Sequence, residues 1–193
     1  MRLAALLLCS LLLGCSVSVE EPKFTTVLRD GDFQVRDYPA LTVAEVRVRG
    51  GQWGAANRGF RLLAHYIFGG NGRQQKIEMT APVVQERLPA SERREGDAWI
   101  VRFIMPEGFT PATLPPPEDE AVRLLALAPG RVAVVRFSGW ALPSMVRGET
   151  ARLDTWMAQR RLESAGPAAL AQYDPPWTIW FMRRNEVMRP VAR

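Results

Sequence analysis

The sequence predicts an α+β fold in which two βαββ-type repeats form a distorted antiparallel β-barrel, or a saddle, flanked by two helices. Three observations carry this prediction: strand-like alternation early in the chain, a helical apolar period from Trp53, and a partial repeat of that pattern in the second half. The 193 residues are enough for one domain with a substantial core.

Turn residues bound the predicted strands. Residues 33–38 alternate apolar and polar side chains, as a half-buried strand does, and Pro39 breaks the alternation. The same period continues over residues 41–48 and stops at a pair of glycines. Residues 77–86 and 99–105 are expected to form a further strand pair, joined by a charged loop.

A helix is expected between these strands. Its predicted core-facing stripe consists of Trp53, Ala56, Phe60, Leu63 and Ile67. Arg58, Arg61 and His65 fall on the opposite, polar face. A glycine-rich turn that begins at Gly69 ends the helix.

The second half of the chain resembles the first. Residues 43–50 align with residues 132–139, and five of the eight positions are identical. Shorter matches place Arg58-Gly59 on Arg147-Gly148 and residues 99–105 on residues 177–183. A repeat of this length indicates a duplicated supersecondary unit, with the cleft between the halves as the natural ligand site. Chance similarity between two amphipathic strands is the alternative.

The N-terminus is typical of a secreted lipoprotein. Arg2 precedes an apolar run that is too short for a bilayer span of roughly 20 residues. The residues that end at Cys15 resemble a lipobox, which predicts a signal peptide over residues 1–14, cleaved before a lipid-modified Cys15. A tether (residues 15–22) and one domain (residues 23–193) follow. An ordinary secretory signal and a plain N-terminal anchor are the alternatives.

The same segment predicts where the protein acts. Ser16 follows the cysteine, and in a Gram-negative cell the lipoprotein sorting rule then favours the outer membrane, facing the periplasm. The mature chain would hold Cys15 alone, which excludes a disulfide within it. The formal net charge is +5, but charges of both signs are interspersed and no basic block predicts nucleic-acid binding. We expect a monomer.

Several segments, in order along the chain, resemble the SOUL haem-binding protein family. They are Gly31–Pro39, Asn57–Leu63, Tyr66–Asn71, Gln75–Val83, Phe103–Pro106, Phe137–Gly139 and Arg183–Val187. The most specific is Met-Thr-Ala-Pro-Val, which follows a Gly-Gly-Asn turn. The resemblance implies two βαββ-type repeats in a distorted barrel and non-covalent binding of haem or another tetrapyrrole rather than catalysis. It also extends to bacterial effector-binding domains, which bind bulky apolar cations.

Few residues of this chain could serve a haem site. The chain has no Cys-x-x-Cys-His motif for covalent attachment, and His65 is its only imidazole. If a haem ring lay on the polar face of the helix, His65 could meet the iron while Arg61 and Arg58 reached the propionates. Met79 is a further candidate ligand. A solvated surface histidine and a core methionine are the structural alternatives, and no metal is expected beyond a haem iron at His65.

The sequence therefore predicts a membrane-tethered binding protein for haem or another tetrapyrrole, acting in buffering or transfer. Two alternatives stay open. One is a binding module for other bulky apolar or cationic molecules. The other is a hydrolase with an acidic residue in the cleft, for which Glu78 is the first candidate. Strand alternation places Glu78 opposite Ile77 and Met79, which favours an exposed carboxylate.

Overall fold

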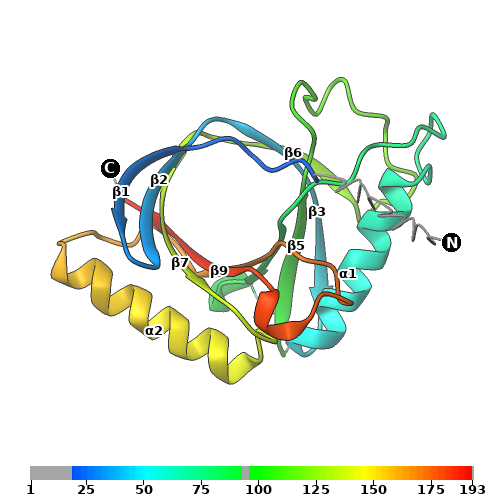
Figure 1. Cartoon of the computed structure of the whole chain (residues 1–193). Helices are drawn as coiled ribbons and strands as arrows, with labels where there is room; N and C mark the ends of the chain where they lie inside the picture. The colour runs from blue at the N-terminus through cyan, green and yellow to red at the C-terminus, as the bar shows by residue number, and fades with distance from the viewer. Residues whose placement is uncertain (1–18, 93–95, 193) are drawn as a thin grey trace, which may run out of the picture.

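The computed structural model describes residues 19–92 and 96–192. The predicted signal peptide, Cys15 and most of the tether lie outside these residues. The described chain forms nine strands in one antiparallel sheet and two long helices on its outer side (Figure 1). The α+β fold is confirmed.

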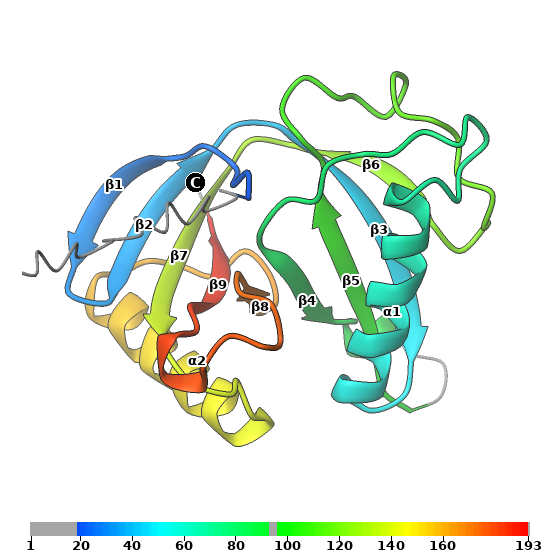
Figure 2. The same cartoon turned by 45° about the vertical axis from the view of Figure 1, so that its right-hand side comes forward.

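The elements follow one another in an order that can be traced by colour in Figures 1 and 2. They are β1 (Thr25–Asp30), β2 (Phe33–Tyr38), β3 (Leu41–Arg49), α1 (Gln52–Ile67), β4 (Val83–Arg87), η1 (Ala90–Glu92), β5 (Ala98–Ile104), β6 (Arg123–Leu127), β7 (Gly130–Phe137), α2 (Pro143–Gln159), β8 (Ala169–Gln172), η2 (Trp180–Met182) and β9 (Asn185–Val191).

The strand order is β1-β2-β7-β9-β8-β4-β5-β3-β6, so β1 and β6 are the two edges of a sheet that curls into an open half-barrel (Figure 1). The predicted barrel is therefore not closed. Both halves have the same connectivity, β3-α1-β4-β5 and β7-α2-β8-β9, while a duplicated sequence remains a prediction. The proposed match of residues 177–183 to strand 99–105 is wrong, because those residues contain η2 and no strand.

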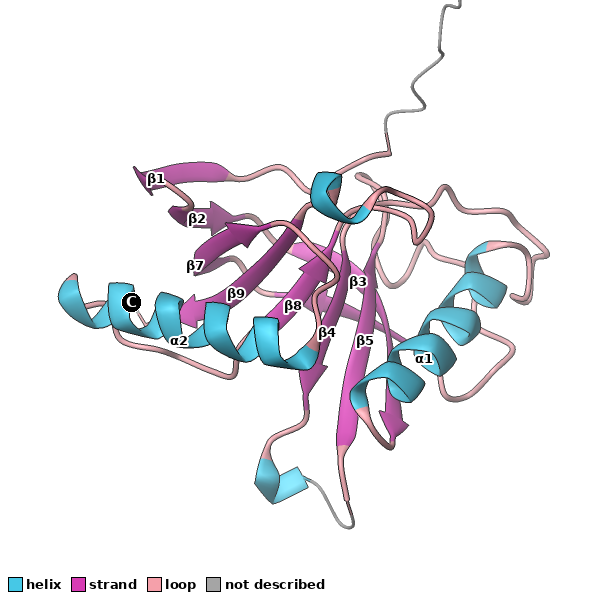
Figure 3. Cartoon of the chain, turned by 60° about the horizontal axis from the view of Figure 1, so that its bottom comes forward, coloured by secondary structure: helices cyan, strands magenta, loops and turns pink. Residues whose placement is uncertain are grey.

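Each helix covers a core on the outer, convex face of the sheet, and Figure 3 shows both helices on that side. Under α1, Leu63 and Tyr66 pack with Val46 and Val101. Under α2, a second cluster includes Leu153, Trp156, Val135 and Val187. Because side chains alternate along a strand, the residues between these core positions point to the concave face.

The buried stripe of α1 differs from the prediction. It consists of Ala55, Gly59, Leu63, Tyr66 and Ile67. Trp53 and Phe60, which were expected in the core, are 51% and 38% exposed. The reason is Gly59, where a Cβ atom would lie only 2.5 Å from Val101 Cγ2. The helix approaches the sheet through this glycine, and that contact turns Trp53 and Phe60 outward.

The strand predicted over residues 77–86 is also shorter than expected. Only Val83–Arg87 is a strand, and the preceding residues make two isolated bridges, between Lys76 and Phe68 and between Thr80 and Glu20. Met79 is consequently not a strand residue and is 36% exposed, so it is not the core methionine of the structural alternative.

Candidate functional site

The concave face of the sheet holds a groove of about 180 Å³. Its walls are mostly aliphatic and proline side chains from strands of both halves, such as Val43, Ile104 and Val132. The polar side chains that line it are Tyr38, Glu86, Arg102 and Tyr173. The groove is therefore an apolar channel with a few fixed polar groups, as ligand sites usually are.

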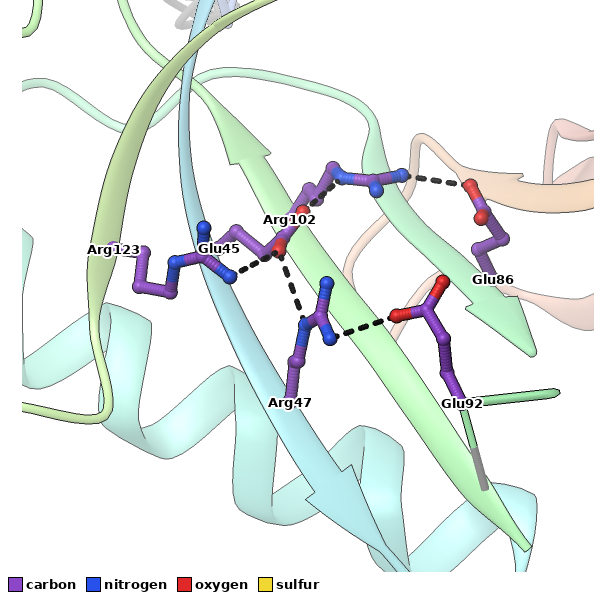
Figure 4. A network of polar contacts seen from close by, with 6 residues as sticks. All are labelled: Glu45, Arg47, Glu86, Glu92, Arg102 and Arg123. Carbon is purple, nitrogen blue, oxygen red and sulfur yellow. Dashed lines mark hydrogen bonds and ion pairs between the residues drawn. The ribbon is translucent and has the colours of Figure 1, made fainter. Parts of the chain in front are cut away.

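An ion-pair network lies on the concave face of β3, β4 and β5 (Figure 4). Arg102 donates to Glu45 at 2.7 Å and to Glu86 at 2.8 Å, and Glu45 is almost fully buried. Arg47 lies 3.7 Å from Glu45 and donates to Glu92 at 2.9 Å. Burial opposes the charge of Arg102, but its hydrogen bonds and attraction to both glutamates outweigh burial and raise its pKa.

The other half of the concave face holds a second, more buried pair. Arg36 on β2 donates to Glu186 on β9 through Nη1 and Nη2, at 2.7 and 2.9 Å. Arg36 also donates to Gln34 at 2.8 Å and to Tyr38 at 3.2 Å, while the hydroxyl of Tyr173 donates to Glu186 at 2.7 Å. Burial opposes the charge of Arg36, but Glu186 outweighs it and the pKa of Arg36 is raised.

The first described residues cover this second pair. The ring of Phe24 lies 4.3 Å from the Arg36 guanidinium carbon, and its centroid is 5.3 Å from that of Tyr38. Pro22 lines the groove, and Glu21 pairs with Arg184 at 2.5 Å. Residues 20–22, which the sequence placed in the tether, therefore contact the domain.

All three tyrosines of the chain are expected to resist ionisation while the protein is folded. Burial raises the pKa of Tyr66 to about 12 and also raises the pKa of Tyr38 and Tyr173. Tyrosine in an unfolded chain has a pKa of about 10. The contribution of these tyrosines to the free energy of unfolding is therefore complete below that pH, and it is lost as the pH rises through their raised pKa values in the folded protein.

The measurement is an alkaline titration that follows tyrosinate absorbance and circular dichroism together. We expect tyrosinate to appear only as the folded signal disappears, and Tyr66→Phe to weaken the pH dependence of stability. Ionisation of all three tyrosines near pH 10 (about the value for free tyrosine) with the fold intact would contradict the prediction.

The four residues predicted to bind haem lie outside the groove. His65, Arg58 and Arg61 are on the exposed face of α1 and Met79 is in the segment after it. The imidazole edge of His65 that carries Nε2 lies against Gly70, where a Cβ atom would come within 2.3 Å. Arg58 donates to the backbone oxygen of Arg49.

Aromatic side chains lie on the exposed face of α1, because the helix is rotated relative to the predicted orientation. Trp53, Phe60 and Phe68 are all exposed, and the Phe60 ring also contacts Phe103 edge-on at 5.3 Å. The helical spacing places Arg61 one turn after Arg58 and one turn before His65. Arg61 makes no ion pair or hydrogen bond with any described residue, so its charge is available to an anionic group.

The groove fits haem less well than the exposed face of α1 does. The groove is smaller than the roughly 300–1,000 Å³ of usual ligand pockets, and its arginine is already paired with two glutamates. Its tyrosines are held neutral by their raised pKa, which disfavours tyrosinate as an iron ligand. The face of α1 supplies an imidazole, an unpaired guanidinium and exposed rings on one surface.

Neither Glu78 nor the tryptophans of the second half of the chain line the groove. Glu78 is exposed and does not line the groove, so the structure does not place it as a base in the cleft. Trp156 is buried under α2, while Trp140, Trp177 and Trp180 are exposed. Across the described ranges there is no cluster of three or more histidine, cysteine or acidic side chains that could hold a metal ion, and no helix there is long and apolar enough to cross a membrane.

Sequence reasoning missed the buried charges. Arg36, Glu45 and Glu186 occupy the polar positions of alternating strands, and such positions are normally exposed to solvent. The one available signal was that both faces of residues 33–38 carry large side chains.

Comparisons with known proteins agree on the fold. The chain is similar to the EcmrR C-terminal domain, with a TM-score of 0.64 and 11% identity over 83% of this chain and 97% of that one. It is similar to a hydrolase from Listeria innocua, with a TM-score of 0.59 and 13% identity over 86% and 94% of the two chains. It also resembles SAV2435 bound to tetraphenylphosphonium, with a TM-score of 0.51 and 15% identity over 83% and 93%. At these identities the likeness shows the fold alone.

The family follows from the sequence comparison. No curated protein matches the chain. The family model described as SOUL heme-binding protein matches residues 19–190, which is most of the chain. The chain therefore belongs to the SOUL heme-binding protein family.

Proposed function

We propose that this protein is a membrane-tethered lipoprotein that binds haem or another tetrapyrrole non-covalently, for buffering or transfer. The observation that carries the proposal is the exposed surface of α1 and of the residue after it, which holds the only histidine, three exposed aromatic side chains and Arg61, which has no partner among the described residues. A planar apolar ring can cover such a face while its carboxylates reach a guanidinium. Bound haem supplies an iron that accepts an axial imidazole.

Each residue on this face has a distinct role in the proposal. Exposed Trp53, Phe60 and Phe68 supply apolar contact for the ring. His65 would supply the nitrogen that ligates the iron. Ligation through Nε2 requires the imidazole to rotate away from Gly70, which an exposed side chain can do between staggered rotamers. Arg61 holds a propionate, and Arg58 can do so only by leaving the Arg49 carbonyl.

The tether supports a role at the membrane. In the proposal, Cys15 carries the lipid and the protein faces the periplasm from the outer membrane. Since residues 20–22 already contact the domain, only the four residues 16–19 separate Cys15 from it, and the five residue steps from Cys15 to Glu20 span at most roughly 17 Å. Haem partitions into lipid, and a domain held this close would meet it there.

Hemin titration of the purified chain tests the proposal. We expect a Soret band at micromolar hemin, and we expect His65→Ala to change its position and Arg61→Ala to weaken binding roughly tenfold, as loss of one charge-assisted hydrogen bond would. Gln159→Ala and Arg147→Ala are matched controls, because both residues are exposed on α2. A flat titration would refute haem binding, and an unchanged His65→Ala spectrum would exclude His65 as the ligand.

A second candidate is binding of a bulky apolar cation in the groove. Its apolar walls and Glu86 favour such a ligand, and the similar SAV2435 structure is bound to tetraphenylphosphonium. Arg102 opposes it by neutralising Glu86. Thermal stabilisation by tetraphenylphosphonium that Glu86→Gln weakens, without a Soret band from hemin, would support this candidate instead.

A further inference from the structure

An exposed apolar surface lies beside the start of α2. We call it the aromatic patch: Trp140, Trp177, Ile179, Trp180, Phe181 and Met182. Each of these side chains is at least 48% exposed, and Trp177 reaches 83%. Leu142 and Met145, at the start of α2, continue it and are also exposed. Contiguous apolar surface of this kind usually marks an interaction site.

The two segments that form the patch are joined by contacts. The backbone N–H of Gly139 donates to the carbonyl of Trp180 at 3.1 Å. The guanidinium of Arg183 lies 4.5 Å from the ring centroid of Trp140. Trp180 and Phe181 meet edge-on at 5.5 Å. The patch is thus one surface and not two separate loops.

Backbone hydrogen bonds hold the patch in shape. Met182 donates to the Ile179 carbonyl at 2.9 Å, and the Arg183 side chain donates to the Thr178 carbonyl at 2.8 Å. The side chains are therefore presented to solvent on a fixed backbone, and their exposure does not come from a loose loop.

The two segments that form the patch carry only positive side chains, although Glu149 and Asp174 border them and Glu21 pairs with Arg184. Residues 139–148 and 175–184 contain Arg147, Arg183 and Arg184 and no acidic residue. A twofold interface between two copies would bring these arginines together, since such an interface uses the same surface twice. An anionic surface has the complementary charge.

The chemistry of the patch matches the interface of a bilayer. Tryptophan is enriched where lipid headgroups meet the hydrocarbon, and arginine can keep its charge among phosphates while its stem lies on apolar groups. The patch also lies next to the N-terminal segment, because Arg184 pairs with Glu21 at 2.5 Å. The patch thus lies near Glu21, in the segment to which the proposed tether leads.

We propose that the aromatic patch inserts into the interface of an anionic bilayer and orients the domain on the membrane. Trp177, Phe181 and Met182, the most exposed side chains, enter the headgroup region, while Arg183 and Arg147 contact lipid phosphates. The lipid anchor determines that the protein is at a membrane, and the patch determines which way it faces. This inference does not depend on haem binding.

Vesicle co-sedimentation without haem tests it. Cys15→Ser in the full chain removes the proposed acyl anchor. Because this parent and its patch variants all retain the apolar N-terminal run, the difference in binding between them measures the contribution of the patch. We expect the parent to sediment with vesicles of phosphatidylcholine and phosphatidylglycerol (three to one) and much less with phosphatidylcholine alone. Trp177→Ala/Phe181→Ala should lower the partition coefficient at least about tenfold, since both removed side chains lose their apolar burial.

Matched variants distinguish binding through the patch from nonspecific adsorption and from purely electrostatic binding. Trp53→Ala removes a tryptophan on α1 that is 51% exposed, outside the patch, and should bind as the parent does. Arg147→Ala should weaken the preference for phosphatidylglycerol more than Arg29→Ala, since Arg29 lies on β1. Circular dichroism checks that each variant folds.

Equal binding by the parent and the Trp177→Ala/Phe181→Ala variant would overturn the proposal, as would a patch-dependent dimer without vesicle binding. Hemin titration of the same variant is expected to be unchanged, so failure here is distinguishable from failure of the proposed function.

Discussion

Replacing Arg36 by methionine is expected to lower the free energy of unfolding by about 3–5 kcal/mol, the range for breaking a buried ion pair from one side. Arg36 is 4% exposed and Glu186 is 2% exposed, so the remaining carboxylate would be buried without its counter-charge. Tyr173 would still donate one hydrogen bond to Glu186, but it supplies no positive charge. Chemical denaturation followed by circular dichroism measures the change.

Two controls distinguish this effect from loss of a side chain. Arg131 makes a similar two-nitrogen contact with Asp37 at 2.8 Å, but that pair is about 40% exposed, and Arg131→Met should cost no more than about 1 kcal/mol. The double variant Arg36→Met/Glu186→Leu removes both charges and should recover most of the lost stability. A double variant as unstable as Arg36→Met alone would show that packing, and not the unpaired carboxylate, causes the loss.

Replacing Asn71 by alanine should lower the free energy of unfolding by about 3 kcal/mol, because several buried backbone groups lose their partners at once. Asn71 is fully buried. Its amide donates to the carbonyls of Tyr66 at 2.9 Å and Gln75 at 2.7 Å. Its side-chain oxygen accepts from the N–H of Gln75 at 3.1 Å and of Arg73 at 3.3 Å.

This asparagine also supports the proposed haem surface. It fixes the turn that follows α1, and Gly70, against which the His65 imidazole lies, is part of that turn. Asn71→Ala should therefore weaken hemin binding as well as stability. Asn57→Ala, exposed on α1, is the matched control and should change stability by less than about 0.5 kcal/mol. Equal losses in the two variants would contradict the role given to Asn71.

The two helices and their flanking strands could be predicted from the sequence, because both kinds of element depend on local periodicity. Trp53 and Phe60 show where that reasoning ended. Their spacing fits an apolar stripe, but the phase of a helix on a sheet is decided by the closest contact, and Gly59 makes that contact with Val101. A glycine has no hydropathy to reveal that it faces the core.

Some residues of the candidate sites could likewise be predicted from the sequence and others could not. The histidine and arginines of α1 were found because a haem ligand must be one of a few residue types, and the chain has one imidazole. The groove and its charges were missed, since Arg36 and Glu186 are 150 positions apart and meet only when β2 and β9 flank β7. Alternation identifies the two faces of a strand but does not say whether the polar face meets water.

By itself the sequence determined the α+β class, the element order of the main strands and helices, and the family to which the chain belongs. These follow from short-range periodicity and from motifs that are contiguous in the chain. Only the tertiary structure decided that the sheet is an open half-barrel, that its concave face buries two ion-pair networks, and that the aromatic patch is exposed. The reason is physical: burial depends on which distant segments pack together, and no local pattern carries that information.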